Sequence, residues 1–127
     1  MRVEGDTESE GRDRGAILVE FALIVPILVI LLVGIIEFGR AYNTQIALQG
    51  AAREGARALA LGQSASAAVD ASRGDITMSV SSSSGCPAGD DDAFATVTTS
   101  TNFTFGIPFV PIGTKTLSAN ASMRCGL

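Results

Sequence analysis

The 127-residue sequence contains no histidine, only two cysteines and nine basic residues. Without histidine, the chain lacks the commonest general base of enzymes and the commonest protein ligand of metal ions. No nucleophile motif or phosphate-binding glycine loop is present either. The formal net charge is −4 and the basic residues are scattered, so nothing supports nucleic-acid binding. We therefore expect no catalytic activity, no cofactor, no metal site and no small-molecule substrate.

The two cysteines, Cys86 and Cys125, both follow a long apolar run in the chain. Because two cysteines allow only one pairing, an extracytoplasmic location would favour a disulfide between them. The loop-entropy model puts the stabilisation from such a bond at about 3–4 kcal/mol. Two independent buried thiols remain the alternative.

The apolar run covers residues 16–38 and reads AILVEFALIVPILVILLVGIIEF. It exceeds the ~20 residues that a helix needs to cross a bilayer, and only Glu20 and Glu37 interrupt its apolar character. We expect a transmembrane helix over this run. A kink near Pro26 is expected too, because proline removes a backbone hydrogen bond and clashes with the preceding turn.

Residues 39–61 continue the helical pattern beyond the apolar run. They are rich in alanine, leucine, glutamine and arginine, which favour helix, and Gly62 is a typical helix end. We therefore expect the helix to project well out of the membrane. Ala47, Ala51 and Gly55 recur at intervals of four, and small residues at that spacing let another backbone approach closely. We expect them to pack against the chain's own sheet, although alanine can also serve simply as a helix former.

Residues 62–127 have a different composition, with strands expected at 75–80, 94–105 and 114–124. The last two are rich in threonine, and turn-forming residues separate all three. Without a crossover helix between them, three such strands form an antiparallel meander. The expected fold is α+β, with the sheet packed on the outer half of the long helix. The three aspartates 90–92 lack the ligand spacing of a calcium loop and are interpreted as a solvated acidic turn.

Residues 1–15 are polar and charged, and we interpret them as a leader without a core of its own. Arg12 and Arg14 lie directly before the apolar run, which favours a cytoplasmic N-terminus and an extracytoplasmic C-terminal region. A secretory signal peptide is disfavoured because its apolar region is only ~7–15 residues long and ends in a small-residue cleavage site. An uncleaved anchor helix and a processed helix both remain open.

The position of Glu20 favours processing. A carboxylate near the centre of a membrane helix costs roughly 2.5–3.5 kcal/mol on insertion scales. Cleavage after Gly15 would make Ala16 the new N-terminus, and its α-amino charge could then pair with Glu20 one turn later. A charged leader, this glycine and a glutamate at this spacing resemble the type IV pilin superfamily, in which a prepilin peptidase cuts after a glycine.

Three blocks of the sequence extend the resemblance. They are a G-x-x-x-VEFA-x-x-x-P start, an EFGR exit from the membrane and an AAREGAR helix, at Gly15–Pro26, Glu37–Arg40 and Ala51–Arg57. In these blocks the chain resembles the TadE-like family. The resemblance implies a minor pilin or pseudopilin of the Tad (Flp, tight adherence) pilus machinery that is held in the cytoplasmic membrane by a single span. It leaves open whether the protein enters the pilus.

The family pattern also implies roles for particular residues and partners. Gly15 would precede the cut, Ala16 would become the N-terminus and Glu20 would serve in assembly. The implied partners are the prepilin peptidase, other minor pilins or pilus subunits, and the pilus assembly platform. Two other interpretations stay open: a major subunit of the pilus fibre, and a membrane-anchored binding module unrelated to pili.

Overall fold

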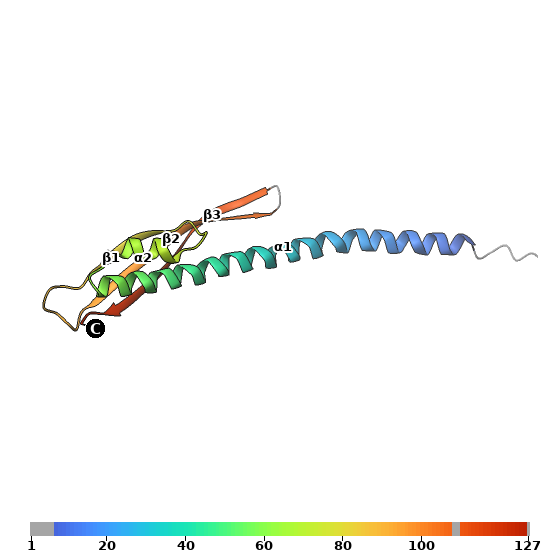
Figure 1. Cartoon of the computed structure of the whole chain (residues 1–127). Helices are drawn as coiled ribbons and strands as arrows, with labels where there is room; N and C mark the ends of the chain where they lie inside the picture. Colours follow the sequence, from blue (N-terminus) through green and yellow to red (C-terminus); the bar gives the residue numbers. More distant parts are fainter. Residues whose placement is uncertain (1–6, 108–109, 127) are drawn as a thin grey trace, which may run out of the picture. The chain divides into compact units, whose positions relative to one another are not determined.

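The computed structural model describes residues 7–107 and 110–126. Two helices precede three strands (Figure 1). The chain divides into two compact units between Ile36 and Glu37. The expected α+β fold, with a long N-terminal helix packed against three antiparallel strands, is confirmed. The elements in chain order are α1 (Thr7–Ala60), α2 (Ala65–Ser72), β1 (Ser79–Ser84), β2 (Phe94–Ile107) and β3 (Val110–Arg124).

The first unit consists of the turns of α1 up to Ile36. From residue 16 onward, apolar side chains point outward on all sides of the helix; Phe21, for example, is 65% exposed and Leu32 58%. A helix that is apolar all round is typical of a membrane span. Among the described residues, α1 is the one helix long and apolar enough to cross a membrane. The kink expected near Pro26 stays a prediction.

The start of α1 differs from the sequence-based expectation. The helix begins at Thr7 rather than near Ala16, so the described part of the expected leader is helical. Extending a formed helix avoids the cost of nucleation, which is the costly step. Gly11 and Gly15 lower the helix propensity by roughly 1 kcal/mol each but do not break the helix. Residues 1–6 of the expected leader lie outside the described residues.

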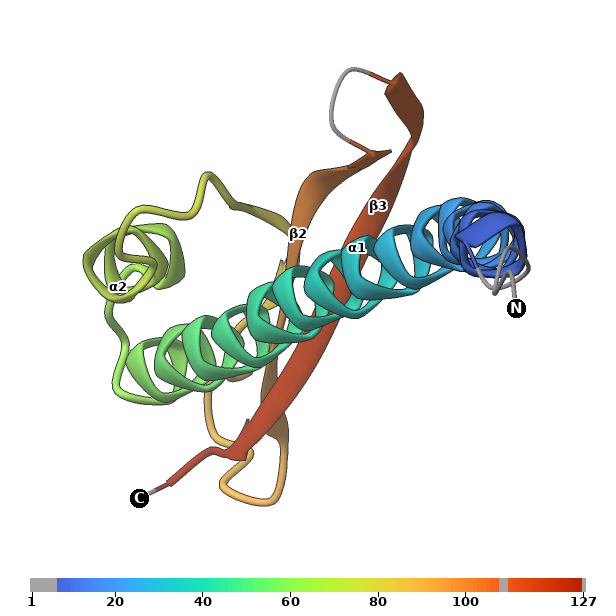
Figure 2. The ribbon, with the colours of Figure 1, turned by 90° about the vertical axis from the view of Figure 1, so that its right-hand side faces the viewer.

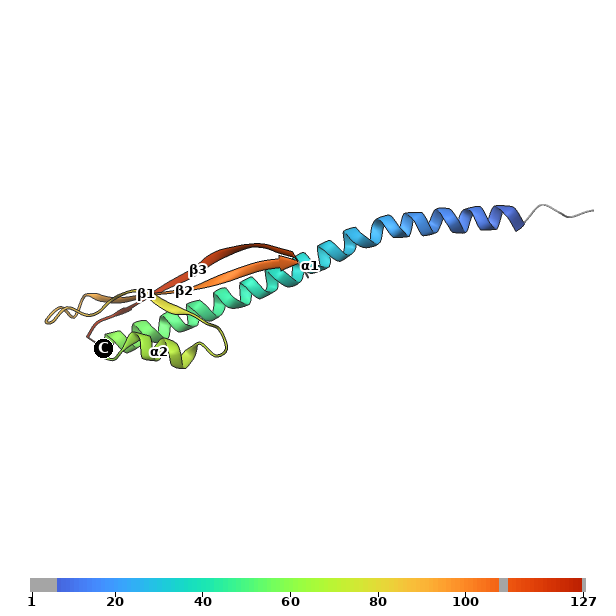
Figure 3. The same cartoon turned by 90° about the horizontal axis from the view of Figure 1, so that it is seen from above.

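In the second unit, the later turns of α1 lie across one face of the sheet, and α2 lies beside them (Figures 2 and 3). The strand order is β1-β2-β3, and both neighbouring pairs are antiparallel. β2 and β3 match the expected strands with longer ends around their hairpin. β1 was expected at 75–80 and lies at 79–84. Its serines have a low strand propensity, but they pair with the threonine-rich β2, so pairing overrides propensity.

The short helix α2 was not expected from the sequence. α1 ends at Ala60, one residue before the expected end, and Gly62 adopts a positive φ of 74° that suits glycine. The Ser64 hydroxyl then caps α2 by accepting a hydrogen bond from the backbone N–H of Ala67 at 3.4 Å. The alanine-rich sequence that follows is a good helix former. The sequence features that indicate α2 were therefore an N-capping serine and a short alanine-rich run.

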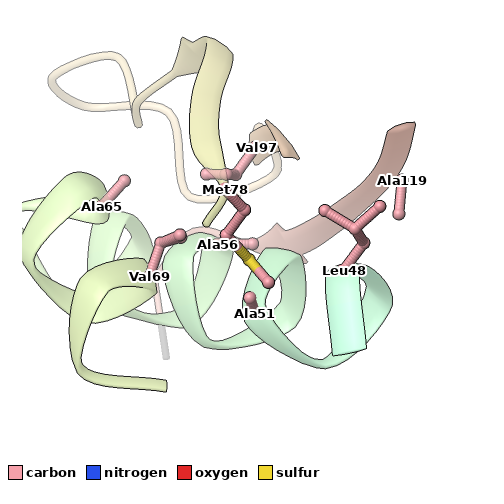
Figure 4. Close-up of a cluster of buried hydrophobic side chains, with 8 residues drawn as sticks. All are labelled: Leu48, Ala51, Ala56, Ala65, Val69, Met78, Val97 and Ala119. Atoms are coloured by element: carbon pink, nitrogen blue, oxygen red, sulfur yellow. The ribbon is translucent and has the colours of Figure 1, made fainter. Parts of the chain in front are cut away.

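A small apolar core joins α1, α2 and the sheet (Figure 4). At its edge the fully buried Thr99 of β2 donates a hydrogen bond to the Leu48 carbonyl of α1 at 2.9 Å. This bond satisfies the buried hydroxyl and fixes the position of the strand along the helix. The core residues are Leu48, Ala51, Ala56, Ala65, Val69, Met78, Val97 and Ala119.

The expected disulfide between Cys86 and Cys125 is present, with a Cα–Cα distance of 5.8 Å. Cys86 follows β1 and Cys125 follows β3, so the bond links the ends of the two edge strands. The Cys125 N–H also donates to the Ala93 carbonyl at 2.8 Å, just before β2 begins. This end of the sheet is therefore closed covalently and by hydrogen bonding.

Candidate functional site

The expected processing position lies within α1. Gly15 and Ala16 are both helical and exposed. A Cβ atom built on Gly15 would meet no other atom within 4 Å. Packing inside the chain therefore does not require glycine at this position. Any requirement for Gly15 would arise from a partner that recognises it.

Glu20 is an exposed carboxylate on the apolar part of α1. It follows Ala16 by four residues, which places the two on one face of the helix, one turn apart. In the uncut chain the Ala16 nitrogen belongs to a peptide bond and carries no charge. The Glu20 carboxylate thus lies on the same helix face as Ala16, whose nitrogen would become an ammonium group on cleavage after Gly15.

The small residues expected to mediate helix packing face the core of the second unit. Ala51 is 1% exposed, Ala47 packs at the edge of the core and Gly55 is buried. A Cβ atom on Gly55 would lie 3.0 Å from Val69 Cγ2 of α2 and 3.1 Å from Val97 Cγ1 of β2. These small residues allow α1 to approach its own sheet and α2 closely. This face is consequently occupied within the chain.

In the sequence, Glu37 and Arg40 stand out only as part of the EFGR block. In the structure, Arg40 Nη1 lies 2.6 Å from Glu37 Oε1. The other oxygen, Glu37 Oε2, accepts a hydrogen bond from the Gly106 N–H of β2 at 3.4 Å. The Arg40 guanidinium lies over the Phe103 ring, 5.4 Å from its centroid, in cation–π geometry.

This Glu37–Arg40 cluster fastens the β2–β3 hairpin to the residues that directly follow the apolar unit. The Glu37 side chain is 16% exposed, and a carboxylate with so little water contact needs polar partners. Gly106 and Arg40 supply them. The signal in the sequence was a second carboxylate at the end of the apolar run with an arginine three residues later, but its partner in β2 was not visible there.

The acidic segment before β2 has a structural role in the fold. Asp92 pairs with Arg124 at the end of β3, and Asp90 Oδ1 accepts a hydrogen bond from the Asp92 N–H at 3.1 Å. In the part of the chain that the structure describes, no three histidine, cysteine, aspartate or glutamate residues gather into a possible metal site. Asp92 thus links this segment to the end of β3, and Asp90 bonds within the segment.

An apolar helix able to span a membrane, followed by a helix-on-sheet unit closed by a disulfide, defines a candidate single-pass membrane protein of the α+β class. The sequence model of the family described as TadE-like protein matches residues 15–57. This confirms the resemblance, and the chain carries a TadE-like segment that includes Gly15, Glu20 and the Glu37–Arg40 cluster. Neither the search of curated proteins nor the search of solved structures found a match.

Proposed function

We propose that the protein is a minor pilin or pseudopilin that acts, without catalytic activity of its own, in the biogenesis of a Tad (Flp) pilus. The observation that carries this proposal is the TadE-like match over residues 15–57. The match begins at Gly15, covers the apolar run of residues 16–38 and ends within the part of α1 that packs on the sheet. The proposed location is the cytoplasmic membrane, with the N-terminus cytoplasmic and the second unit extracytoplasmic.

In the proposed mechanism, a prepilin peptidase cuts after Gly15 and leaves Ala16 with a charged α-amino group. The Glu20 carboxylate pairs with that group, or with the same group on a neighbouring subunit, and the pairing offsets the cost of a carboxylate in lipid. The apolar turns of α1 then pack against the helices of other minor pilins or pilus subunits at the assembly platform. Helix–helix contact in the membrane is thus the proposed mode of action.

The second unit favours an accessory subunit over the major fibre subunit. It has its own core and a disulfide, so it forms a folded exterior beyond the helix. Major subunits of the resembled pilus class are expected to be little more than the helix. A low ratio of this chain to the major subunit in purified pili would agree with the accessory role.

Gene deletion with complementation in the native host tests the proposal. We expect deletion to reduce the number of pili seen by electron microscopy, and the intact chain to restore it. The Glu20→Ala variant should fail to restore piliation while accumulating in the membrane. Glu54→Ala, which removes an exposed carboxylate from the other half of α1, is the matched control and should restore it. Normal piliation after deletion would contradict the proposal.

A further inference from the structure

Within the second unit, β2 runs along α1 from Leu48 toward Glu37. Thr99 bonds to Leu48, and further along β2 Gly106 bonds to Glu37. Glu37 directly follows Ile36, the last residue of the apolar unit. The hydrogen bond to Glu37 therefore places the turn end of the β2–β3 hairpin, where β2 passes into β3, beside the first residue of the second unit.

Exposed apolar side chains lie at the turn end of the hairpin. Ile107 is 40% exposed, Val110 57% and Ile112 66%. Ile107 and Val110 are paired across the two strands and therefore share a face of the hairpin. The register of the two strands shifts between Phe105 and Gly106, and Ile112 is the extra residue of β3 at this bulge. Single exposed apolar residues are ordinary on protein surfaces, but a cluster of them marks a contact site.

Exposed aromatic and basic side chains also lie in the turns of α1 that follow Glu37 and on β3. Phe38 and Tyr42 are 73% and 61% exposed and stack with their ring centroids 6.5 Å apart. Lys115 adds a positive charge; it is exposed and lies opposite Phe103 in the strand register, whereas the charge of Arg40 is paired with Glu37. Exposed aromatic rings with basic residues beside apolar ones are typical of chains that lie in the headgroup region of a bilayer.

We propose that the turn end of the β2–β3 hairpin, represented by Ile107, Val110 and Ile112, is a second membrane contact that inserts into the interface of the bilayer that α1 spans. The inference rests on the proposed membrane span of α1. The position of the hairpin favours lipid over a protein partner, because Gly106 is hydrogen-bonded to Glu37, the residue that directly follows the apolar unit. The hairpin and α1 together would then hold the second unit at two points and restrict its tilt on the membrane.

The chain contains no tryptophan, so a single substitution introduces a unique fluorescent probe. We would reconstitute the full chain in phosphatidylcholine vesicles with or without bromine atoms on the acyl chains, which quench tryptophan on contact. Ile112→Trp reports the hairpin end. Phe94→Trp is the matched control, because Phe94 is an exposed apolar residue (58%) at the opposite end of β2. Ile30→Trp reports the apolar part of α1.

We expect strong quenching by brominated lipid at Ile30→Trp and severalfold stronger quenching at Ile112→Trp than at Phe94→Trp. Adding Val110→Asp to Ile112→Trp should lose most of the quenching at the hairpin, because it places a charge in the contact. Phe94→Trp also controls for the preference of tryptophan itself for lipid interfaces.

Each of the other possible outcomes would contradict the hairpin contact, its occupant or the membrane span. Quenching at Ile30→Trp but not at Ile112→Trp would overturn the hairpin contact and leave the membrane span intact. Protection of Ile112→Trp from both brominated lipid and aqueous acrylamide would replace lipid with a neighbouring subunit as the occupant. Equal quenching at residues 94 and 112, or no effect of Val110→Asp, would show that the turn end of the hairpin has no specific contact with lipid. Absence of quenching at Ile30→Trp would overturn both the span and the hairpin contact.

Discussion

At the scale of single residues, Gly55 is a position in the core where packing tolerates little change. Its missing Cβ leaves room for Val69 and Val97, which would lie 3.0 and 3.1 Å from that atom. We predict that Gly55→Leu lowers the free energy of unfolding by about 1–3 kcal/mol, because overpacking a dense core forces side chains off their rotamers. Thermal unfolding of the full chain in detergent micelles, followed by circular dichroism, measures the change.

Gly50 provides the matched control for Gly55. It lies in the same helix, is exposed, and a Cβ atom there would meet nothing within 4 Å. We expect Gly50→Leu to stabilise the fold by about 0.5–1 kcal/mol, since leucine is the better helix former. If both variants shift the unfolding temperature in the same direction, the packing interpretation of Gly55 is wrong.

Glu37 allows a second residue-scale prediction. Removing its carboxylate in Glu37→Ala should speed hydrogen exchange at the Gly106 amide about tenfold, because a hydrogen bond to a charged acceptor is worth about 1.5–3 kcal/mol and some of that is regained from water. Glu37→Gln keeps an acceptor oxygen and should have an intermediate effect. The exposed Arg40 contributes less, as expected of a surface ion pair.

Glu54→Ala is the control for Glu37→Ala, since Glu54 is an exposed glutamate of α1 and should leave the Gly106 exchange rate unchanged. An unchanged rate in Glu37→Ala itself would show that the bond to Gly106 does not hold the hairpin.

The predictability of these residues from sequence follows the range of their contacts. The spacing of Gly15, Ala16 and Glu20 is local, so the pattern alone could indicate a candidate processing site. The disulfide partners could be paired because only two cysteines exist. The partners of Glu37 lie in β2, far along the chain, and no local pattern predicts a hydrogen bond to Gly106.

At the scale of secondary-structure elements, the disulfide joins the two edge strands of a three-stranded sheet. Cys86 and Cys125 are 39 residues apart in the sequence, and closing a loop of that size removes about 3–4 kcal/mol of chain entropy from the unfolded state. We predict that the double variant Cys86→Ser/Cys125→Ser is less stable by that amount. Denaturant unfolding of the full chain in detergent measures the difference.

Reduction separates the effect of the bond from the effect of the substitutions. A reductant should lower the unfolding midpoint of the native chain and leave that of the double variant unchanged. Equal midpoints for the oxidised native chain and the double variant would contradict a stabilising disulfide.

The elements themselves were predictable to different degrees. α1 and the long strands β2 and β3 follow from composition over many residues, which averages out local exceptions. α2 and β1 are short, and their boundaries depend on tertiary contacts. The serines at 82–84 have no preference for strand, and their pairing with β2 makes this segment a strand. The helical residues 7–14 likewise depend on the formed helix that follows them.

At the scale of the whole molecule, an apolar unit that can span a membrane is followed by a folded unit with its own core. The TadE-like segment crosses the boundary between them. The same helix therefore supplies the proposed membrane contacts in one unit and the packing surface in the other. The central claim is that this chain is processed before it assembles.

That claim predicts different outcomes for two glycines of α1. A Cβ atom on Gly11 or on Gly15 would meet nothing within 4 Å, so neither glycine is required for packing. We predict that Gly15→Leu blocks cleavage and that Gly11→Leu does not, because only Gly15 lies at the proposed cut. Immunoblots of membranes should show the uncut, larger chain in the Gly15→Leu variant alone. Equal processing of both variants would exclude Gly15 as the recognised residue.

The most direct test is the N-terminal sequence of the protein purified from the membranes of its native host. We predict a chain that begins at Ala16, with Glu20 as its fifth residue. A chain that still begins at Met1, in cells with an active prepilin peptidase, would contradict it and leave an uncleaved membrane-anchored module in its place.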